Sequence, residues 1–106
     1  MADERLVIVA TLTVRVGALA EFREFERHAA RVMARYGGAI ERTVFAMVEG
    51  EPDLAREIHV VTFPNEAAFA SYRSDPELTA LTPTRDRAVV KTEVVVGVDG
   101  PDYGPA

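Results

Sequence analysis

The chain contains no cysteine among its 106 residues. Disulfide bonds, thiolate metal sites and a cysteine nucleophile are therefore excluded. Basic residues are also few, because 12 lysines and arginines stand against 17 acidic residues and give a net charge of −5. Nucleic acids and anionic membranes bind basic surfaces, so this balance argues against both as partners.

Long apolar runs are missing as well. The apolar run from Leu6 to Leu12 is far shorter than the roughly 18 residues that cross a membrane. It follows an acidic start, Met1 to Glu4, whereas a secretory signal has a basic start and a cleavage site of small residues. We therefore expect a cytoplasmic protein without a membrane segment.

Familiar catalytic and nucleotide-binding motifs are absent too. The sequence has no Gly-rich phosphate loop, nucleophile elbow or His-Glu-x-x-His run. The composition, 48% hydrophobic and 27% charged, is that of an ordinary globular chain, and its length suits one compact domain. We expect that domain over residues 1–98, followed by a loose tail rich in Gly, Pro and Asp over residues 99–106.

The hydrophobic pattern predicts four strands and two helices. The expected strands are residues 5–14, 39–48, 57–63 and 88–96, and the expected helices are residues 18–36 and 66–73. Gly37-Gly38 ends the first helix, residues 50–53 form a turn, Asn65 caps the second helix, Pro76 restarts it and Pro83 weakens its continuation. The order β-α-β-β-α-β predicts a ferredoxin-like α+β fold, with a four-stranded antiparallel sheet and both helices on one face.

Two helices shield only one face of such a sheet, yet the first two strands are apolar on both faces. In the first strand Val7 and Val9 alternate with Ile8, and in the second Val44 alternates with Phe45. An uncovered apolar face of this extent is typical of an association site. We therefore predict a homodimer whose two sheets pack face to face, the alternative being a monomer with many exposed β-branched residues.

The two histidines are the first candidates for chemistry. His59 lies within the third expected strand and shares its face with Glu57, so it is either a pocket acid or base or a hydrogen-bonded core histidine. His28, at the flank of the first helix, is either a ligand-binding group or a polar boundary residue. Glu24 and Glu57 could join the two histidines in a site for zinc, manganese or iron. Because a glutamate four residues before a histidine is common on helix surfaces, we expect no metal and no cofactor.

Arginines form the other candidate set. An arginine that enters a mostly apolar pocket orients a carboxylate or phenolate with paired donors, whereas most arginines are solvated in surface ion pairs. The candidates are Arg42, Arg73, Arg85 and Arg87, and we favour the first two. The predicted catalytic residues are His59, Tyr72 and Arg42, and the predicted ligand-binding residues are His28, Arg73, Phe63 and Phe25.

Three segments carry a resemblance to a known family. They are Arg35-Tyr36-Gly37-Gly38 at the end of the first helix, residues 60–68 from the third strand into the second helix, and residues 72–78. Over roughly residues 5–97 the chain resembles the dimeric α+β barrel superfamily, in its small branch of uncharacterised domains of unknown function. It is more distantly similar to the antibiotic-biosynthesis monooxygenases. The resemblance implies a pocket between helices and sheet in each protomer, and dimerisation through the sheets.

In the monooxygenase relatives, the second helix commonly carries a histidine, then a serine and a further histidine. The resemblance places Tyr72, Asp75 and Glu77 at these positions. Both histidines are absent, which argues against heme degradation and against quinol oxygenation by the relatives' scheme. It leaves a cofactor-free oxidation in which a tyrosine or arginine holds an acidic phenol.

Together these observations predict a homodimer that binds a small, mostly apolar molecule between its helices and sheet. It would act as a cofactor-free oxygenase or isomerase of secondary or degradative metabolism, with His59 moving a proton and Tyr72 or an arginine holding the developing oxyanion. The alternative is a non-catalytic ligand sensor or accessory dimerisation module. An enzyme needs at least two convergent titratable groups with perturbed pKa values in the pocket, whereas a binding module can be walled by apolar side chains alone.

Overall fold

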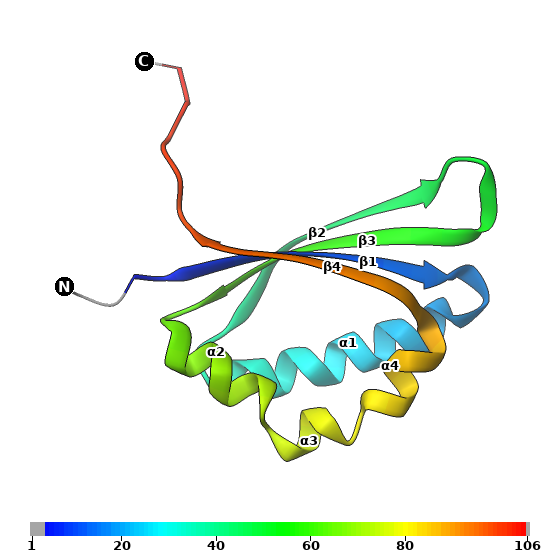
Figure 1. Cartoon of the computed structure of the whole chain (residues 1–106), viewed down its shortest axis with the longest axis horizontal. Helices are drawn as coiled ribbons and strands as arrows, with labels where there is room; N and C mark the ends of the chain where they lie inside the picture. Colours follow the sequence, from blue (N-terminus) through cyan, green and yellow to red (C-terminus); the bar gives the residue numbers. More distant parts are fainter. Residues whose placement is uncertain (1–3, 106) are drawn as a thin grey trace.

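An antiparallel sheet forms one layer of the molecule and the helices form the other (Figure 1). The structure is a computed structural model that describes residues 4–105; residues 1–3 and 106, at the ends of the expected domain and tail, lie outside the described residues. The strands are β1 (Leu6–Arg15), β2 (Ala39–Val48), β3 (Glu51–Phe63) and β4 (Val89–Val98). The helices are α1 (Leu19–Ala34), α2 (Glu66–Arg73), α3 (Pro76–Thr79) and α4 (Thr82–Ala88). The sheet order β2-β3-β1-β4 confirms the ferredoxin-like α+β fold.

The second helical region is longer than the sequence analysis expected. Asn65 caps α2 by accepting a hydrogen bond from the Ala68 amide at 2.9 Å. Asp75 caps α3 in the same way, through the Glu77 amide at 2.8 Å. The helix that restarts at Pro76 ends at Thr79 and does not continue through Pro83, which lies instead in the first turn of the separate helix α4, where its missing N–H is not needed. Three short helices therefore follow one another over the same face as α1 (Figure 1).

Strand β3 begins earlier than predicted, at Glu51 rather than Glu57. The turn between β2 and β3 is confined to residues 49–50, where Gly50 has a φ of 77°. Pro52 is tolerated in the strand because the β2 ladder passes directly from Glu51 to Ala55, so no β2 residue pairs with it.

Strand β2 contains a bulge near its start. Ile40 pairs with Val61, but the next paired residue, Arg42, faces Val60, so Glu41 is an extra residue in the ladder. Glu41 accepts a hydrogen bond from the Thr62 hydroxyl at 2.7 Å. The bulge changes the alternation of β2, and Arg42 lies on the face of the sheet away from the helices, as Val60 does.

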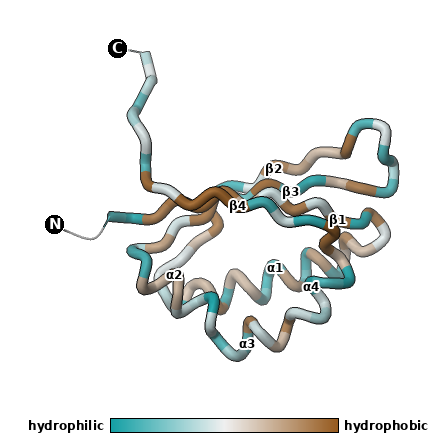
Figure 2. Tube along the Cα trace, in the orientation of Figure 1, coloured by the Kyte–Doolittle hydropathy of each residue, from teal (hydrophilic) through white to brown (hydrophobic). Residues whose placement is uncertain are grey.

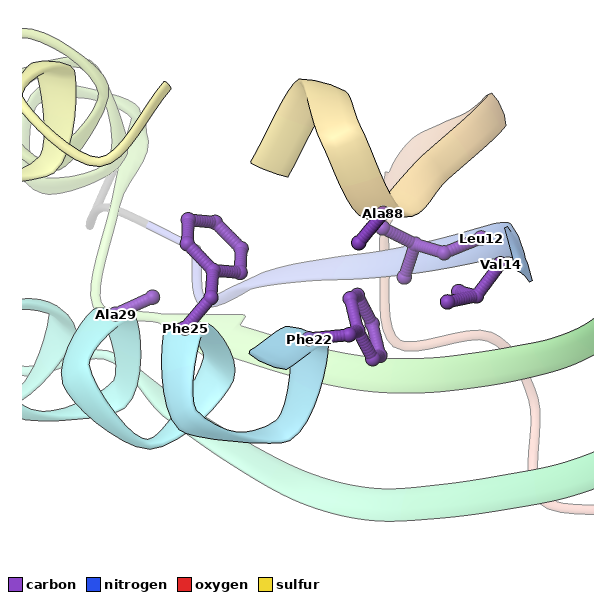
Figure 3. Packing of buried hydrophobic residues seen from close by; sticks show 6 residues of the cluster. All are labelled: Leu12, Val14, Phe22, Phe25, Ala29 and Ala88. Carbon is purple, nitrogen blue, oxygen red and sulfur yellow. The ribbon is translucent and has the colours of Figure 1, made fainter. Parts of the chain in front are cut away.

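The core lies between the sheet and the helices in two clusters. The first joins β1, α1 and α4 and contains Leu12, Val14, Phe22, Phe25, Ala29 and Ala88 (Figure 3). The second lies at the other end of α1 and contains Leu6, Ile8, Met33, Val61 and Phe63. Gly37, with a φ of 74°, ends α1, and the Gly38 amide donates to the Met33 carbonyl at 3.0 Å. This close turn brings the second cluster against the start of β2.

The opposite face of the sheet carries no helix within residues 4–105 (Figure 1). Hydrophobic residues are frequent along the strands (Figure 2). The strand registers place Val9, Val44, Val60 and Val95 on this open face, and Val95 is 68% exposed. In the described chain, no helix is long and apolar enough to cross a membrane.

Candidate functional site

A cavity of about 320 Å³ lies between the sheet and the helices. Side chains from β1, β3 and β4 form its floor, and side chains from all four helices form its walls. The apolar lining includes Ile8, Leu12, Phe25, Met33, Val61, Phe63, Phe69, Leu78 and Val94. The polar lining is Glu26, His59, Tyr72, Arg73, Arg85 and the threonines Thr79, Thr82 and Thr92. Ligand sites of proteins typically combine an apolar wall with a few polar groups in this way.

The imidazole of His59 lies between two carboxylates on the cavity wall. Its Nε2 atom is 2.8 Å from Oε1 of Glu57, and its Nδ1 atom is 3.5 Å from Oε2 of Glu26. The histidine is only 4% exposed, and its ring stacks on Phe22 with 6.4 Å between the ring centroids. These contacts hold the imidazole in one orientation.

Glu57 reaches His59 because residues two apart in a strand share a face. Its other oxygen lies 4.0 Å from Nε of Arg23 on α1. The Arg23 guanidinium is itself placed over the ring of Phe45, with 5.3 Å to the ring centroid. Glu57 therefore has a cation on one side and the imidazole on the other.

Burial raises the pKa of the Glu26 carboxyl above its usual value. The nearby charges of His59 and Arg85 oppose this shift and that of Glu57 reinforces it, with burial as the largest cause. The sequence analysis did not single out Glu26. The signal was present, because Glu26 lies one helical turn from both Phe22 and Ala29 and so falls within the apolar stripe of α1.

Tyr72 on α2 packs against Phe63, with 5.3 Å between the ring centroids. Burial, reinforced by the charge of Glu26 and opposed by that of Arg85, raises the pKa of its hydroxyl to about 12. The hydroxyl therefore stays protonated at neutral pH and can donate a hydrogen bond. It is suited to stabilising a negative charge rather than to removing a proton.

Two arginines border the cavity. Arg85 on α4 donates a hydrogen bond to Oγ1 of Thr92, and its nearest carboxylate is the exposed Asp86 at 3.9 Å. Arg73, at the end of α2, lies over the ring of Phe69 with 5.5 Å to the centroid. Among the described residues, Arg73 makes no ion pair within 4.0 Å.

The structure brings five of the seven predicted site residues to this cavity: Phe25, His59, Phe63, Tyr72 and Arg73. Arg42 is not among them, because it lies on the open face of the sheet, whereas the prediction required it to enter the pocket. Arg85, a candidate that we did not favour, borders the cavity instead.

His28 lies elsewhere, in a shallow groove between α1 and α4. Its Nε2 atom pairs with Glu77 of α3, which also accepts a hydrogen bond from Arg35 at 2.7 Å. These two contacts hold the pKa of the Glu77 carboxyl below its usual value. His28 and His59 thus have different carboxylate partners. Over residues 4–105 no group of three or more potential ligands is placed to hold a metal ion.

The pattern of a family described as a domain of unknown function, DUF1330, matches residues 7–99. The chain belongs to this family. This confirms the predicted membership of a branch of uncharacterised domains of unknown function, and the family description itself names no activity. No match was found among curated proteins.

Solved structures show where else the fold of this DUF1330 protein occurs. A protein of unknown function from Rhodopseudomonas palustris, RPA0582, has a TM-score of 0.77 at 15% identity, over 94% of this chain and 85% of that one. SnoaB from Streptomyces nogalater, a cofactor-independent oxygenase, has a TM-score of 0.68 at 18% identity, over 96% and 99% of the two chains. A protein from Nitrosomonas europaea named after the antibiotic biosynthesis monooxygenases has a TM-score of 0.70 at 13% identity, over 93% of each chain. At these identities the likeness shows the fold alone, which the chain shares with SnoaB and with the protein from Nitrosomonas europaea.

Proposed function

We propose that this DUF1330 protein binds a small, mostly apolar molecule in the cavity and removes a proton from it without a cofactor. The observation that carries the proposal is the buried His59, held between Glu57 and Glu26 on an otherwise apolar wall. Two groups on that wall, Glu26 and Tyr72, have raised pKa values. Perturbed titratable groups that converge on one pocket favour an enzyme over a simple binding module.

The geometry supports a division of roles. In the tautomer that we assign, His59 donates Nε2–H to Glu57, and Nδ1, 3.5 Å from Glu26, is left to act as the base. The protonated hydroxyl of Tyr72 donates to the oxyanion that forms when the ligand loses its proton. If His59 returns the proton to another atom of the ligand, the reaction is an isomerisation and needs no co-reactant.

Oxygenation would begin with the same proton removal and would use dioxygen as the second substrate. The fold that the chain shares with SnoaB supports this second reaction type. Both reaction types depend on His59 in the same way, so the first test concerns proton removal rather than the final product.

We also propose that the protein is a homodimer in which the open faces of two sheets pack together. The support is the uncovered row of valines, such as Val44 and Val95, which are 42% and 68% exposed. An exposed apolar surface of this kind is stabilised by association. A dimer with twofold symmetry buries the same face on both copies.

Native mass spectrometry of untagged protein, purified without added metal or ligand, tests assembly and binding together. We expect a dimer, with additional mass from a retained small molecule that can then be identified. A monomer at micromolar concentration would contradict the dimer. The ligand site would be contradicted if the dimer retained no small molecule and if no compound of an apolar library raised its melting temperature.

Proton removal is tested on the retained or library-derived ligand in deuterated water. We expect the wild-type protein to exchange an acidic proton of the ligand for deuterium, as followed by NMR, and expect His59→Gln and Glu26→Gln to slow the exchange. Glu24→Gln is the matched control, because Glu24 is on the same helix as Glu26 but pairs with Arg27. Binding with an exchange rate that His59→Gln leaves unchanged would indicate a non-catalytic ligand-binding module.

A further inference from the structure

We propose that the natural ligand is a monocarboxylate of one or two rings, whose carboxylate is bound by Arg85. This inference rests on the proposed function only in taking the cavity as the ligand site. It adds the charge, the size and the orientation of the molecule that enters.

The charge follows from the groups that face the cavity. The whole chain has a net charge of −5, yet two arginines, Arg73 and Arg85, border this one cavity. Glu26, the carboxyl among the lining residues, is buried, and burial disfavours its charged form. A cationic ligand would be repelled, and a neutral ligand would cover Arg85 and leave it with the exposed Asp86, 3.9 Å away, as its charged partner.

Arg85 is better placed than Arg73 to bind the anion. The side chain of Arg85 is 34% exposed, so its charge is partly withdrawn from water and less screened than that of a surface arginine. One of its nitrogens is engaged by Thr92, which fixes the guanidinium and leaves other N–H donors for a planar carboxylate. Arg73, at the exposed end of α2, contributes positive charge at the edge of the cavity.

The orientation of the ligand follows from the position of Arg85 in the cavity lining. Arg85, Glu26 and Tyr72 all line the cavity, and the charge of Arg85 is close enough to oppose the raised pKa values of the other two. A carboxylate on Arg85 leaves the apolar body of the ligand against Phe25, Phe63 and Phe69. The carbon skeleton next to the carboxylate then faces Glu26 and His59.

The size follows from the cavity volume. A cavity of 150 Å³ in a protein core holds benzene, so about 320 Å³ holds roughly twice as much, on the order of 12 non-hydrogen atoms. A fused two-ring aromatic acid has this size.

Titration calorimetry with 2-naphthoate and 2-naphthamide tests the inference, because the two probes have the same shape and differ in charge. We expect the wild-type protein to bind the acid at least about tenfold more tightly than the amide, as a charge-assisted hydrogen bond predicts. Arg85→Gln should abolish this preference and leave amide binding unchanged. Arg87→Gln is the matched control, since Arg87 is on the same helix, is exposed and pairs with Glu21; it should keep the preference.

The outcomes separate this inference from the proposed function. Equal binding of acid and amide to the wild-type protein would overturn the carboxylate assignment and leave the cavity as a ligand site. A preference for the acid that persists in Arg85→Gln would overturn the role of Arg85. If neither probe binds, both the carboxylate inference and a ligand site of this size are refuted.

Discussion

Replacement of Gly38 by alanine tests how closely the end of α1, the start of β2 and the cavity wall are packed. A Cβ atom at this position would lie 2.4 Å from Cε1 of Phe63 and 2.6 Å from Cγ of Met33, whereas real Cβ atoms essentially never come closer than 3.0 Å. Gly38 does not have a positive φ, so alanine can adopt its backbone conformation and the cost of the substitution comes from steric overlap.

The size of the destabilisation depends on whether the side chains around the new Cβ atom can move. Overpacking of a core costs about 1–3 kcal/mol. Phe63 borders the cavity, so its ring can move into empty space, and we expect a loss of about 1–2 kcal/mol from the free energy of unfolding. For a domain of this size that loss lowers the melting temperature by about 4–15 °C. The displaced ring would also occupy part of the cavity and weaken ligand binding.

Thermal unfolding followed by circular dichroism measures the first effect, and titration with the two naphthyl probes measures the second. Gly17→Ala is the control, because a Cβ at Gly17 has no atom within 4 Å, and it should leave the melting temperature unchanged or slightly raised. A Gly38→Ala protein that melts with the wild type would refute the packing argument. A destabilised protein with unchanged affinity would show that Phe63 does not move into the cavity.

Two further predictions concern charge and assembly. Burial raises the pKa of Glu26 in the folded state, so the free energy of unfolding falls as pH rises through that pKa. Glu26→Gln should therefore be more stable than the wild type at pH 7. The difference should shrink as pH falls toward the ordinary value of 4.5. Urea unfolding at several pH values checks this, and a variant less stable at pH 7 would contradict it. Val95→Glu should produce monomers in light scattering, whereas Val98→Glu, at an exposed valine of the same strand facing the helix side, should remain dimeric. Equal behaviour of the two variants would argue against the open face as the interface.

The order of the elements could be predicted because the strands and α1 are long enough to show a period. Ten-residue segments rich in apolar and β-branched residues identified β1 and β2, and the stripe from Phe22 to Met33 identified α1. The short helices α3 and α4 could not be found in this way. One or two turns do not establish a period, and among their residues only Ala88 is buried.

The candidate site was predictable only in part. His59 was visible because a polar side chain interrupts a buried strand face, and the structure places it on the cavity wall. Alternation sorts a strand into two faces but does not say which face the helices cover, so Arg42 could not be placed. Glu26, Tyr72 and Arg85 come from three different helices, and only the packing of those helices brings them to one cavity.

The bulge at Glu41 has a consequence for how this strand can change in evolution. Ile40 and Arg42 already face neighbouring residues of β3, Val61 and Val60, so loss of the Glu41 codon would leave both pairs and the faces of residues 42–48 unchanged. Pairing of Glu41 within the ladder would instead move Arg42 to the helix side and Phe45 to the outer surface, since the side chains of a strand alternate with a period of two. The strand can thus lose this residue, but cannot take it into the regular ladder, without a change in the side chains that meet the helices.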